Sequence, residues 1–225
     1  MTNKKLFSKP ASVDGIPGDL GAQDRNVLNI HKDPSTKSTQ QSASEAKIPK
    51  TFNIAIDLDG TLIKEDLTYL AVQKLIETNP LNALRICLWY SIGGRAYCKR
   101  KMAQAWPIDP SSLTYNYPLL DYVKKQKNAN IALATGADFN YAKAIADHLE
   151  IFDAMISSNS LINMTGNNKA AALHSYYKTD DFIYAGNESI DLKVWEKCKG
   201  AITVNVPSHI LQQVPKNKII KNFDF

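Results

Sequence analysis

Two carboxylates stand two residues apart in the run Asp-Leu-Asp-Gly-Thr, at Asp57 and Asp59. The preceding residues, 52–57, are mostly apolar and β-branched, which is typical of a buried strand. Because the chain leaves the sheet after such a strand and Gly60 permits a sharp turn, both carboxylates can face a single site. This arrangement suits a catalytic pair, although an acidic pair before Gly-Thr, taken alone, is more often part of a turn or a helix cap.

Three further features have residue types that bind phosphates or cations. Thr135 and Gly136 supply a hydroxyl and backbone N–H groups at a predicted helix start, where a phosphate can bind. Lys169 begins an alanine-rich helix whose N-terminus is itself positive. Asn187 and Asp191 place an amide oxygen and a carboxylate one helical turn apart, which suits a hard cation with oxygen ligands. Taken singly, each feature has an ordinary alternative as a helix cap or a solvated surface residue.

The predicted elements explain how these residues could meet. Strands alternate with helices from residue 119 onward. The predicted strands after 52–57 are 130–135, 152–157, 181–185 and 201–205, and the predicted helices are 119–127, 139–149, 169–177 and 188–198. This alternation implies right-handed crossovers and an α/β fold with a parallel sheet covered on both faces. Ligands of such sheets bind beyond the carboxyl ends of the strands, where the four features fall.

Two segments lie outside this alternation. Residues 1–50 are rich in Ser, Thr, Gln, Lys, Pro and Gly and lack a sustained period, so we predict a mostly disordered tail. Residues 66–118 are predicted to form a small helical cap inserted after the first strand. Its helices are predicted at 67–76, 81–90 and 95–105, with breaks at Asn79-Pro80 and Gly93-Gly94. The core then comprises residues 51–65 and 119–225.

Composition excludes several classes of protein. The 225 residues carry a net charge of +5, of which residues 1–50 hold +3, so the body lacks the concentrated positive field of a nucleic-acid binder. The three cysteines have no paired or CxxC spacing, which argues against a disulfide framework and a zinc site. No apolar run approaches the ~20 residues that span a bilayer. We therefore expect a cytoplasmic protein, with peripheral membrane contact as a second expectation.

The predicted cap suggests what that membrane contact would be. No Asp or Glu occurs from Thr78 to Ile108, and basic residues alternate with large apolar ones. The basic residues are Arg85, Arg95, Lys99, Arg100 and Lys101. A basic, aromatic-rich amphipathic surface is typical of contact with an anionic lipid interface or with a lipid phosphate. The alternative is a cap that packs on its own core and leaves its basic residues solvated.

The order Asp-Leu-Asp-Gly-Thr, Ala-Thr-Gly, Lys169 and Gly-Asn-x-x-x-Asp resembles the haloacid dehalogenase (HAD) superfamily, which consists mostly of Mg²⁺-dependent phosphatases. The resemblance covers about residues 52–206 and implies a Rossmann-like HAD core. It implies that Asp57 is a nucleophile that forms an aspartyl-phosphate and that Asp59 acts as general acid and base. Lys169 would assist catalysis and, with Thr135 and Gly136, bind the phosphoryl oxygens.

The resemblance also implies a metal site with one departure from the pattern. Mg²⁺ would be bound by Asp57, Asp59, Asn187 and Asp191. Phosphatases of this superfamily usually carry Asp where this chain has Asn187, and an amide oxygen brings no charge. We therefore predict a reduced Mg²⁺ affinity unless Asp191 or Glu188 compensates.

A narrower resemblance concerns the substrate. The Asp-Leu-Asp-Gly-Thr-Leu-Ile run, the Leu-Trp-Tyr-x-x-Gly-Gly segment and the Lys-Ala-Ala-Ala-Leu helix are similar to the HAD domain fused to UbiA-type polyprenyl transferases. This similarity implies a small phosphorylated substrate or a polyprenyl phosphate, and the chain is either a stand-alone relative or a fragment of such a fusion. Two alternatives to a phosphatase stay open, a phosphotransferase and a non-catalytic binding module.

Overall fold

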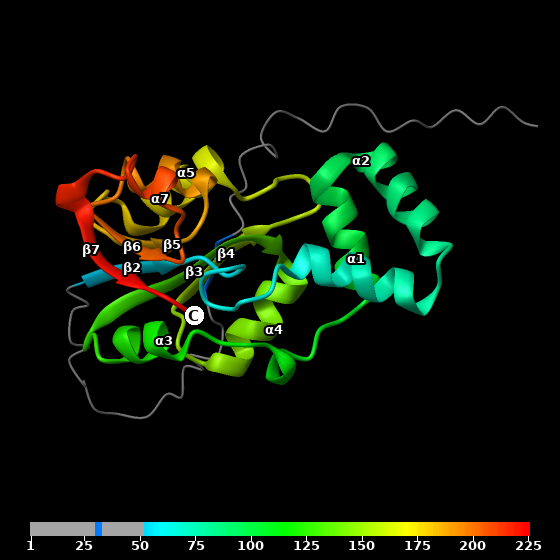
Figure 1. The fold of residues 1–225 in the computed structure, drawn as a ribbon, viewed down its shortest axis with the longest axis horizontal. Helices are drawn as coiled ribbons and strands as arrows, with labels where there is room; N and C mark the ends of the chain where they lie inside the picture. The colour runs from blue at the N-terminus through cyan, green and yellow to red at the C-terminus, as the bar shows by residue number, and fades with distance from the viewer. Residues whose placement is uncertain (1–29, 33–51) are drawn as a thin grey trace, which may run out of the picture.

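The computed structural model describes residues 30–32 and 52–225, and its centre is a seven-stranded sheet (Figure 1). The strands are β1 (Ile30–Lys32), β2 (Phe52–Ile56), β3 (Ala129–Asp138), β4 (Ala154–Ser158), β5 (Ile183–Gly186), β6 (Gly200–Val204) and β7 (Ile219–Phe223). Their order in the sheet is β1-β4-β3-β2-β5-β6-β7. Strands β2 to β7 pair in parallel, whereas β1 is antiparallel to β4. The predicted parallel, Rossmann-like α/β fold is confirmed.

Helices cover both faces of this sheet. The α-helices of the described residues are α1 (Leu67–Thr78), α2 (Asn82–Ala105), α3 (Tyr117–Lys124), α4 (Phe139–Leu149), α5 (Gly166–Tyr177), α6 (Leu192–Trp195) and α7 (Ser208–Leu211). α3 and α4 pack on one face, and α5, α6 and α7 pack on the other (Figure 1). In β2 the buried Ile54 and Ile56 face the α3 and α4 side, whereas Ala55 faces α5, as the two-residue period of a strand requires.

Several elements differ from those that the sequence predicts. The sequence gives no signal for β7, because only Phe223 of this edge strand is buried. β1 lies inside the segment predicted to be a disordered tail. The rest of that prediction, residues 1–29 and 33–50, lies outside the described residues. The predicted helix 188–198 is shorter in the structure, where a 3₁₀ turn at Ser189–Asp191 leads into α6.

α1 and α2 pack against each other and project from one end of the sheet (Figure 1). The predicted break at Gly93-Gly94 is confirmed, because Gly94 interrupts α2 with φ 68° and ψ −165°. This left-handed φ favours glycine, and it divides α2 into a first segment, 82–93, and a second segment, 95–105. The second segment carries the side chains that reach β3 and α4. No helix in the described part of the chain is long and apolar enough to cross a bilayer.

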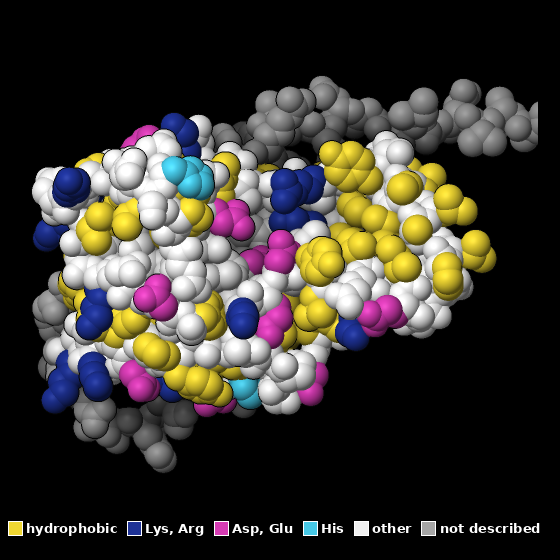
Figure 2. Space-filling model, viewed as in Figure 1, with side chains coloured by type: hydrophobic (Ala, Val, Ile, Leu, Met, Phe, Trp, Pro, Cys, Tyr) yellow, Lys and Arg dark blue, Asp and Glu magenta, His cyan; other side chains and the backbone are white. Residues whose placement is uncertain are grey.

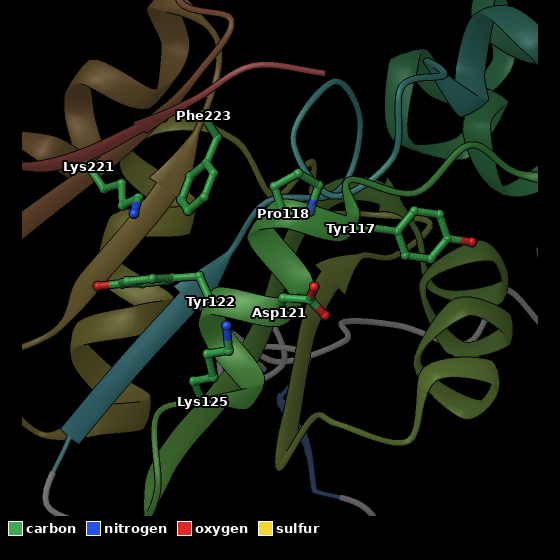
Figure 3. A pocket seen from close by; sticks show the side chains of 7 residues that line it. All are labelled: Tyr117, Pro118, Asp121, Tyr122, Lys125, Lys221 and Phe223. Atoms are coloured by element: carbon green, nitrogen blue, oxygen red, sulfur yellow. The ribbon is translucent and has the colours of Figure 1, made fainter.

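Two features of the surface are an apolar region and a pocket. Figure 2 shows apolar side chains gathered over α1 and α2, with charged side chains at the junction between this region and the core. The pocket lies between α3 and the C-terminal strand β7 (Figure 3). It is lined by Tyr117, Pro118, Asp121, Tyr122, Lys125, Lys221 and Phe223. None of the residues predicted from the sequence to bind or react lines it, so we assign it no chemistry.

Candidate active site

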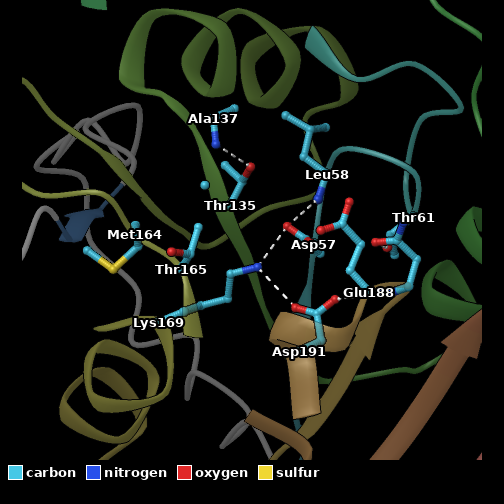
Figure 4. A network of polar contacts seen from close by, with 12 residues as sticks. Asp57, Leu58, Thr61, Thr135, Ala137, Met164, Thr165, Lys169, Glu188 and Asp191 are labelled. Atoms are coloured by element: carbon cyan, nitrogen blue, oxygen red, sulfur yellow. Dashed lines mark hydrogen bonds and ion pairs between the residues drawn. The ribbon is translucent and has the colours of Figure 1, made fainter. Parts of the chain in front are cut away.

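Three buried charged side chains meet beyond the carboxyl end of β2 (Figure 4). Asp57 follows β2 directly, Lys169 lies in the first turn of α5, and Asp191 ends the 3₁₀ turn after β5. The Lys169 Nζ lies 2.9 Å from Asp57 Oδ1 and 3.4 Å from Asp191 Oδ1. The parallel sheet therefore brings Asp57 together with two charged residues that follow it in the sequence by more than a hundred positions.

The carboxylate of Asp191 is held by four donors. Its Oδ1 accepts from the Tyr184 hydroxyl at 2.6 Å and from Lys169, which also donates to the Tyr184 oxygen at 2.7 Å. Its Oδ2 accepts from the backbone N–H groups of Asn187 and Glu188 at 3.0 and 3.1 Å. Both oxygens are thus engaged by protein donors, which fits a role in positioning Lys169 better than the predicted role as a metal ligand. Tyr184 itself was not found by sequence reasoning, because it lies in an apolar strand.

The turn after Asp57 is fixed by close packing against the loop that follows β5. Gly60 has φ +69°, and a Cβ added there would overlap the amide nitrogen of Asn187. The Thr61 hydroxyl donates to Asn187 Oδ1 at 3.1 Å. Asp59 Oδ1 accepts from the Leu67 N–H at 3.0 Å, at the start of α1. The predicted need for glycine at position 60 therefore has a second cause, since only glycine leaves room for the amide.

Thr135 and Gly136 lie within β3 rather than at a helix start. The Thr135 side chain is fully buried, and its Oγ1 accepts from the Ala137 N–H at 2.9 Å. α4 begins only at Phe139, and its cap is Asp138, whose carboxylate accepts from the Asn140 N–H. The predicted helix 139–149 coincides with α4, whereas the strand predicted to end at residue 135 continues to Asp138 and takes up the expected loop. The buried hydroxyl still lies at the edge where Asp57 emerges (Figure 4).

Lys99 is a member of this site that sequence reasoning assigned elsewhere. The sequence predicted a lipid-facing or solvated position for Lys99, but its side chain is buried and its Nζ donates to the Gly136 carbonyl at 2.7 Å. Within the described residues this ammonium makes no ion pair. The signal was present in the sequence, because Lys99 lies three and four positions before Met102 and Ala103, which also face inward.

Arg100, the next residue, likewise turns toward the core. Its Nε lies 2.7 Å from Asp138 Oδ2, and the Asp138 side chain is almost fully buried. Two of the five basic residues expected on a solvated or lipid-facing surface thus bind the β3–α4 junction. The second segment of α2 therefore carries positive charge to the edge of the sheet where Asp57 lies.

Burial sets the protonation of the two motif carboxyls. Desolvation raises the pKa of Asp57 to about 6, although Lys169 opposes the shift. Desolvation also raises the pKa of Asp59 to about 7, opposed by the hydrogen bond from the Leu67 N–H. Burial alone would lower the pKa of Lys169, but Asp57 and Asp191 raise it above its ordinary value. Asp59 can therefore exchange a proton near neutral pH, which suits a general acid and base.

These pKa values predict that the metal-free protein loses stability as the pH rises. Both carboxyls have an ordinary pKa of 3.8, against about 6 and about 7 in the folded protein. Their contribution to folding is therefore full below the ordinary value and is lost as the pH rises through the folded values. In the presence of a chelator, we expect a Tm about 5 °C lower near pH 8 than near pH 5.

Circular dichroism melting at the two pH values checks this result. Asp59→Asn should reduce the difference in Tm, because the amide does not ionise. Asp147→Asn is the matched control, since the side chain of Asp147 is 62% exposed and its removal should leave the difference unchanged. A pH dependence as large in Asp59→Asn as in the wild type would contradict the assignment.

The residues around Asp57 fit a hard divalent cation. Both hydrogen bonds to Asp57 within the described residues use Oδ1, so Oδ2 is available to a ligand. Asn187 Oδ1 lies against the turn that carries Asp59. The candidate metal ligands are therefore all oxygen atoms, as a hard cation prefers. Among the described residues no group of three or more His, Cys, Asp or Glu could hold a metal. An amide in place of a carboxylate at position 187 is consistent with that finding.

The fold is similar to that of solved haloacid dehalogenase-like hydrolases and phosphoserine phosphatases. A HAD family hydrolase from Salmonella enterica serovar Typhi matches with a TM-score of 0.53 and 17% identity, over 76% of this chain and 67% of that one. An apo phosphoserine phosphatase matches with a TM-score of 0.53 and 12% identity, over 76% and 92% of the two chains. A phosphoserine phosphatase with an analogue of its phospho-aspartyl intermediate matches with a TM-score of 0.50 and 13% identity, over 77% and 93%.

Among curated proteins, the chain is similar to the uncharacterised protein y4nM of Sinorhizobium fredii. The two are 33% identical over 151 residues, which is 66% of this chain and 29% of y4nM. The chain therefore spans less than a third of the length of that relative. No protein-family model matches the chain. The predicted relation to UbiA-type fusions stays a prediction.

Proposed function

We propose that the protein is a Mg²⁺-dependent phosphomonoesterase that works through an aspartyl-phosphate. The observation that carries this proposal is the buried pair of Asp57 and Lys169, 2.9 Å apart at the carboxyl end of a central parallel strand. A carboxylate nucleophile beside a fixed cation can attack phosphorus while the cation offsets charge on the phosphoryl oxygens. The fold shared with phosphoserine phosphatases supports the same chemistry.

The reaction would proceed in two displacements. A carboxylate oxygen of Asp57 attacks phosphorus, the bond from phosphorus to the ester oxygen breaks, and Asp59 donates its proton to the departing alcohol. Asp59 then takes a proton from water, whose oxygen attacks phosphorus and releases the Asp57 carboxylate with inorganic phosphate. The pKa of Asp59, raised to about 7, allows it to act in both directions near neutrality.

The remaining residues would bind and orient the phosphoryl group. Lys169, Thr135 and the Gly136 N–H would hold its oxygens, and Asp191 would keep Lys169 in place. Lys99 would bring a second cation from the cap to the same edge of the sheet. Asp57, Asp59 and Asn187 would hold Mg²⁺, which when bound offsets the negative charge of the phosphate. The substrate class is a phosphate monoester, either a small phosphorylated molecule or a polyprenyl phosphate.

Hydrolysis of an aryl phosphate, with Mg²⁺ titrated against a chelator, tests this function. We expect turnover that requires Mg²⁺ and releases inorganic phosphate. Product analysis in the presence of an added alcohol separates hydrolysis from phosphotransfer, because a phosphotransferase forms a new ester. If the protein neither turns over the aryl phosphate nor forms a beryllium fluoride adduct at Asp57, it is a binding module and the proposal is wrong.

Asn187→Asp should strengthen the binding of Mg²⁺. Asp and Asn have nearly the same shape, so the variant should fit against Gly60 while adding a negative charge to the ligand set. We expect the Mg²⁺ concentration for half-maximal turnover to fall by about tenfold. The rise in Tm on addition of Mg²⁺, which does not depend on turnover, should grow in parallel. An unchanged Mg²⁺ requirement in both assays would show that position 187 does not bind the metal.

A further inference from the structure

A stripe of exposed apolar side chains runs along the first segment of α2. Its members are Leu81, Leu84, Leu88 and Ile92, which we call the apolar stripe, and their exposed fractions are 65%, 70%, 57% and 64%. Their spacing of three, four and four residues places them on one side of a helix. Single exposed leucines are common on proteins, but a continuous stripe marks a surface that contacts something apolar. Figure 2 shows this apolar region over α1 and α2.

The stripe is not an unfilled part of the core. The first segment of α2 uses its other side for α1, where Asn82 is buried and its amide donates to the Leu75 carbonyl at 2.7 Å. Ile86 packs partly against the same core cluster. Gly94 then redirects the chain, so that the second segment provides the contacts with β3 and α4. The side of α2 that carries the stripe is left without an intramolecular partner among the described residues.

The charged residues that α2 itself places beside the stripe are positive only. The sequence has no Asp or Glu from Thr78 to Ile108, and Arg85 is exposed next to Leu84. The Arg85 guanidinium lies 5.1 Å from the centre of the Trp89 ring, and Tyr90 is 60% exposed. Arginine beside Trp and Tyr is characteristic of the boundary between apolar lipid and headgroups. A second copy of the chain would bring equal positive charges together, whereas an anionic surface would complement them.

From these observations we propose that the first segment of α2 inserts the apolar stripe into the interface of an anionic lipid membrane. The helix would lie along the membrane surface, with its apolar side chains among the acyl chains and Arg85 at the headgroups. This contact involves fewer basic residues than the one predicted from the sequence, because Lys99 and Arg100 face the core and take no part in it. It also goes beyond the proposed phosphatase activity and does not depend on it.

Co-flotation of the full chain with vesicles tests the proposal. The probes are vesicles of phosphatidylcholine mixed with phosphatidylglycerol, and vesicles of phosphatidylcholine alone. We expect binding to the anionic vesicles, and a loss of about tenfold in Leu84→Ser/Leu88→Ser. Leu161→Ser is the matched control, since Leu161 is 83% exposed but lies outside the stripe, and it should bind as the wild type does. Arg85→Gln should weaken binding to the anionic vesicles only.

Each outcome supports or overturns the inference. Circular dichroism first confirms that the variants are folded, which the exposure of the replaced side chains favours. An absence of binding to anionic vesicles at low salt overturns the proposal. Equal binding by the wild type and by Leu84→Ser/Leu88→Ser also overturns the proposal, because the contact would then be electrostatic alone. Light scattering measures the oligomeric state as the third test. If the wild type forms a dimer that Leu84→Ser/Leu88→Ser abolishes, a second copy covers the stripe and the membrane proposal is wrong.

Discussion

Hydrolysis of an aryl phosphate should fall by at least about a thousandfold when Asp57 is replaced with Asn. The amide has the shape of the carboxylate but no charged oxygen that can attack phosphorus. Lys169 would keep its contact with Asp191, so the fold around the site should survive the change. Because Asn and Asp have nearly the same volume, a simple loss of packing cannot account for the expected effect.

Two measurements make this result specific. Rapid acid quenching of the wild type with labelled substrate should trap phosphate as an acyl phosphate that hydroxylamine cleaves, and Asp57→Asn should trap none. Asp147→Asn serves as control, because it replaces an exposed carboxylate that pairs with Lys143 on α4. Turnover by Asp57→Asn within about tenfold of the wild type would contradict the role of Asp57 as nucleophile.

Lys169→Met should affect both activity and stability. The ammonium lies between two buried carboxylates, so its loss leaves Asp57 and Asp191 without their cation. We expect the free energy of unfolding to fall by about 3 kcal/mol, as when one partner of a buried ion pair is removed. Turnover should fall by about a hundredfold or more, because the phosphoryl oxygens lose a fixed positive charge.

A second substitution separates these two effects. Lys169→Met/Asp191→Asn removes one of the stranded charges and should recover part of the stability measured by urea unfolding, without recovering activity. Lys169→Met should also raise the pKa of Asp57 above about 6, because Lys169 is the charge that lowers it. Lys143→Met, an exposed lysine of α4, is the control. If the double variant regained wild-type turnover, Lys169 would be needed only for folding.

The sequence predicted which charged residues come together better than it predicted their surroundings. Asp57, Lys169 and Asp191 could be placed together because each follows a strand, and parallel strands end at a common edge. Tyr184 could not be predicted, since its contact with Asp191 depends on the turn after β5 and not on any pattern in the strand. The position of Thr135 inside β3 was missed for a related reason, because strand pairing continues past the last apolar residues.

The orientation of the cap residues was the largest error of interpretation. Charge and aromatic content indicated one amphipathic surface for the whole of residues 78–108. The structure divides it at Gly94, whose left-handed φ gives the two segments of α2 different neighbours. Composition counts charges without regard to this division, so it grouped Lys99, which bonds Gly136, with Arg85, which faces outward.

Strand β1 extends the sheet with only three residues, Ile30–Lys32, that pair with β4. An unpaired edge strand exposes a row of N–H and C=O groups that can pair with another molecule. By pairing with β4, β1 protects the backbone groups of β4 from pairing with another molecule. The sequence around β1 has no pattern that predicts a strand. A shortened protein that began at residue 51, as composition alone would recommend, would expose that edge and become prone to self-association.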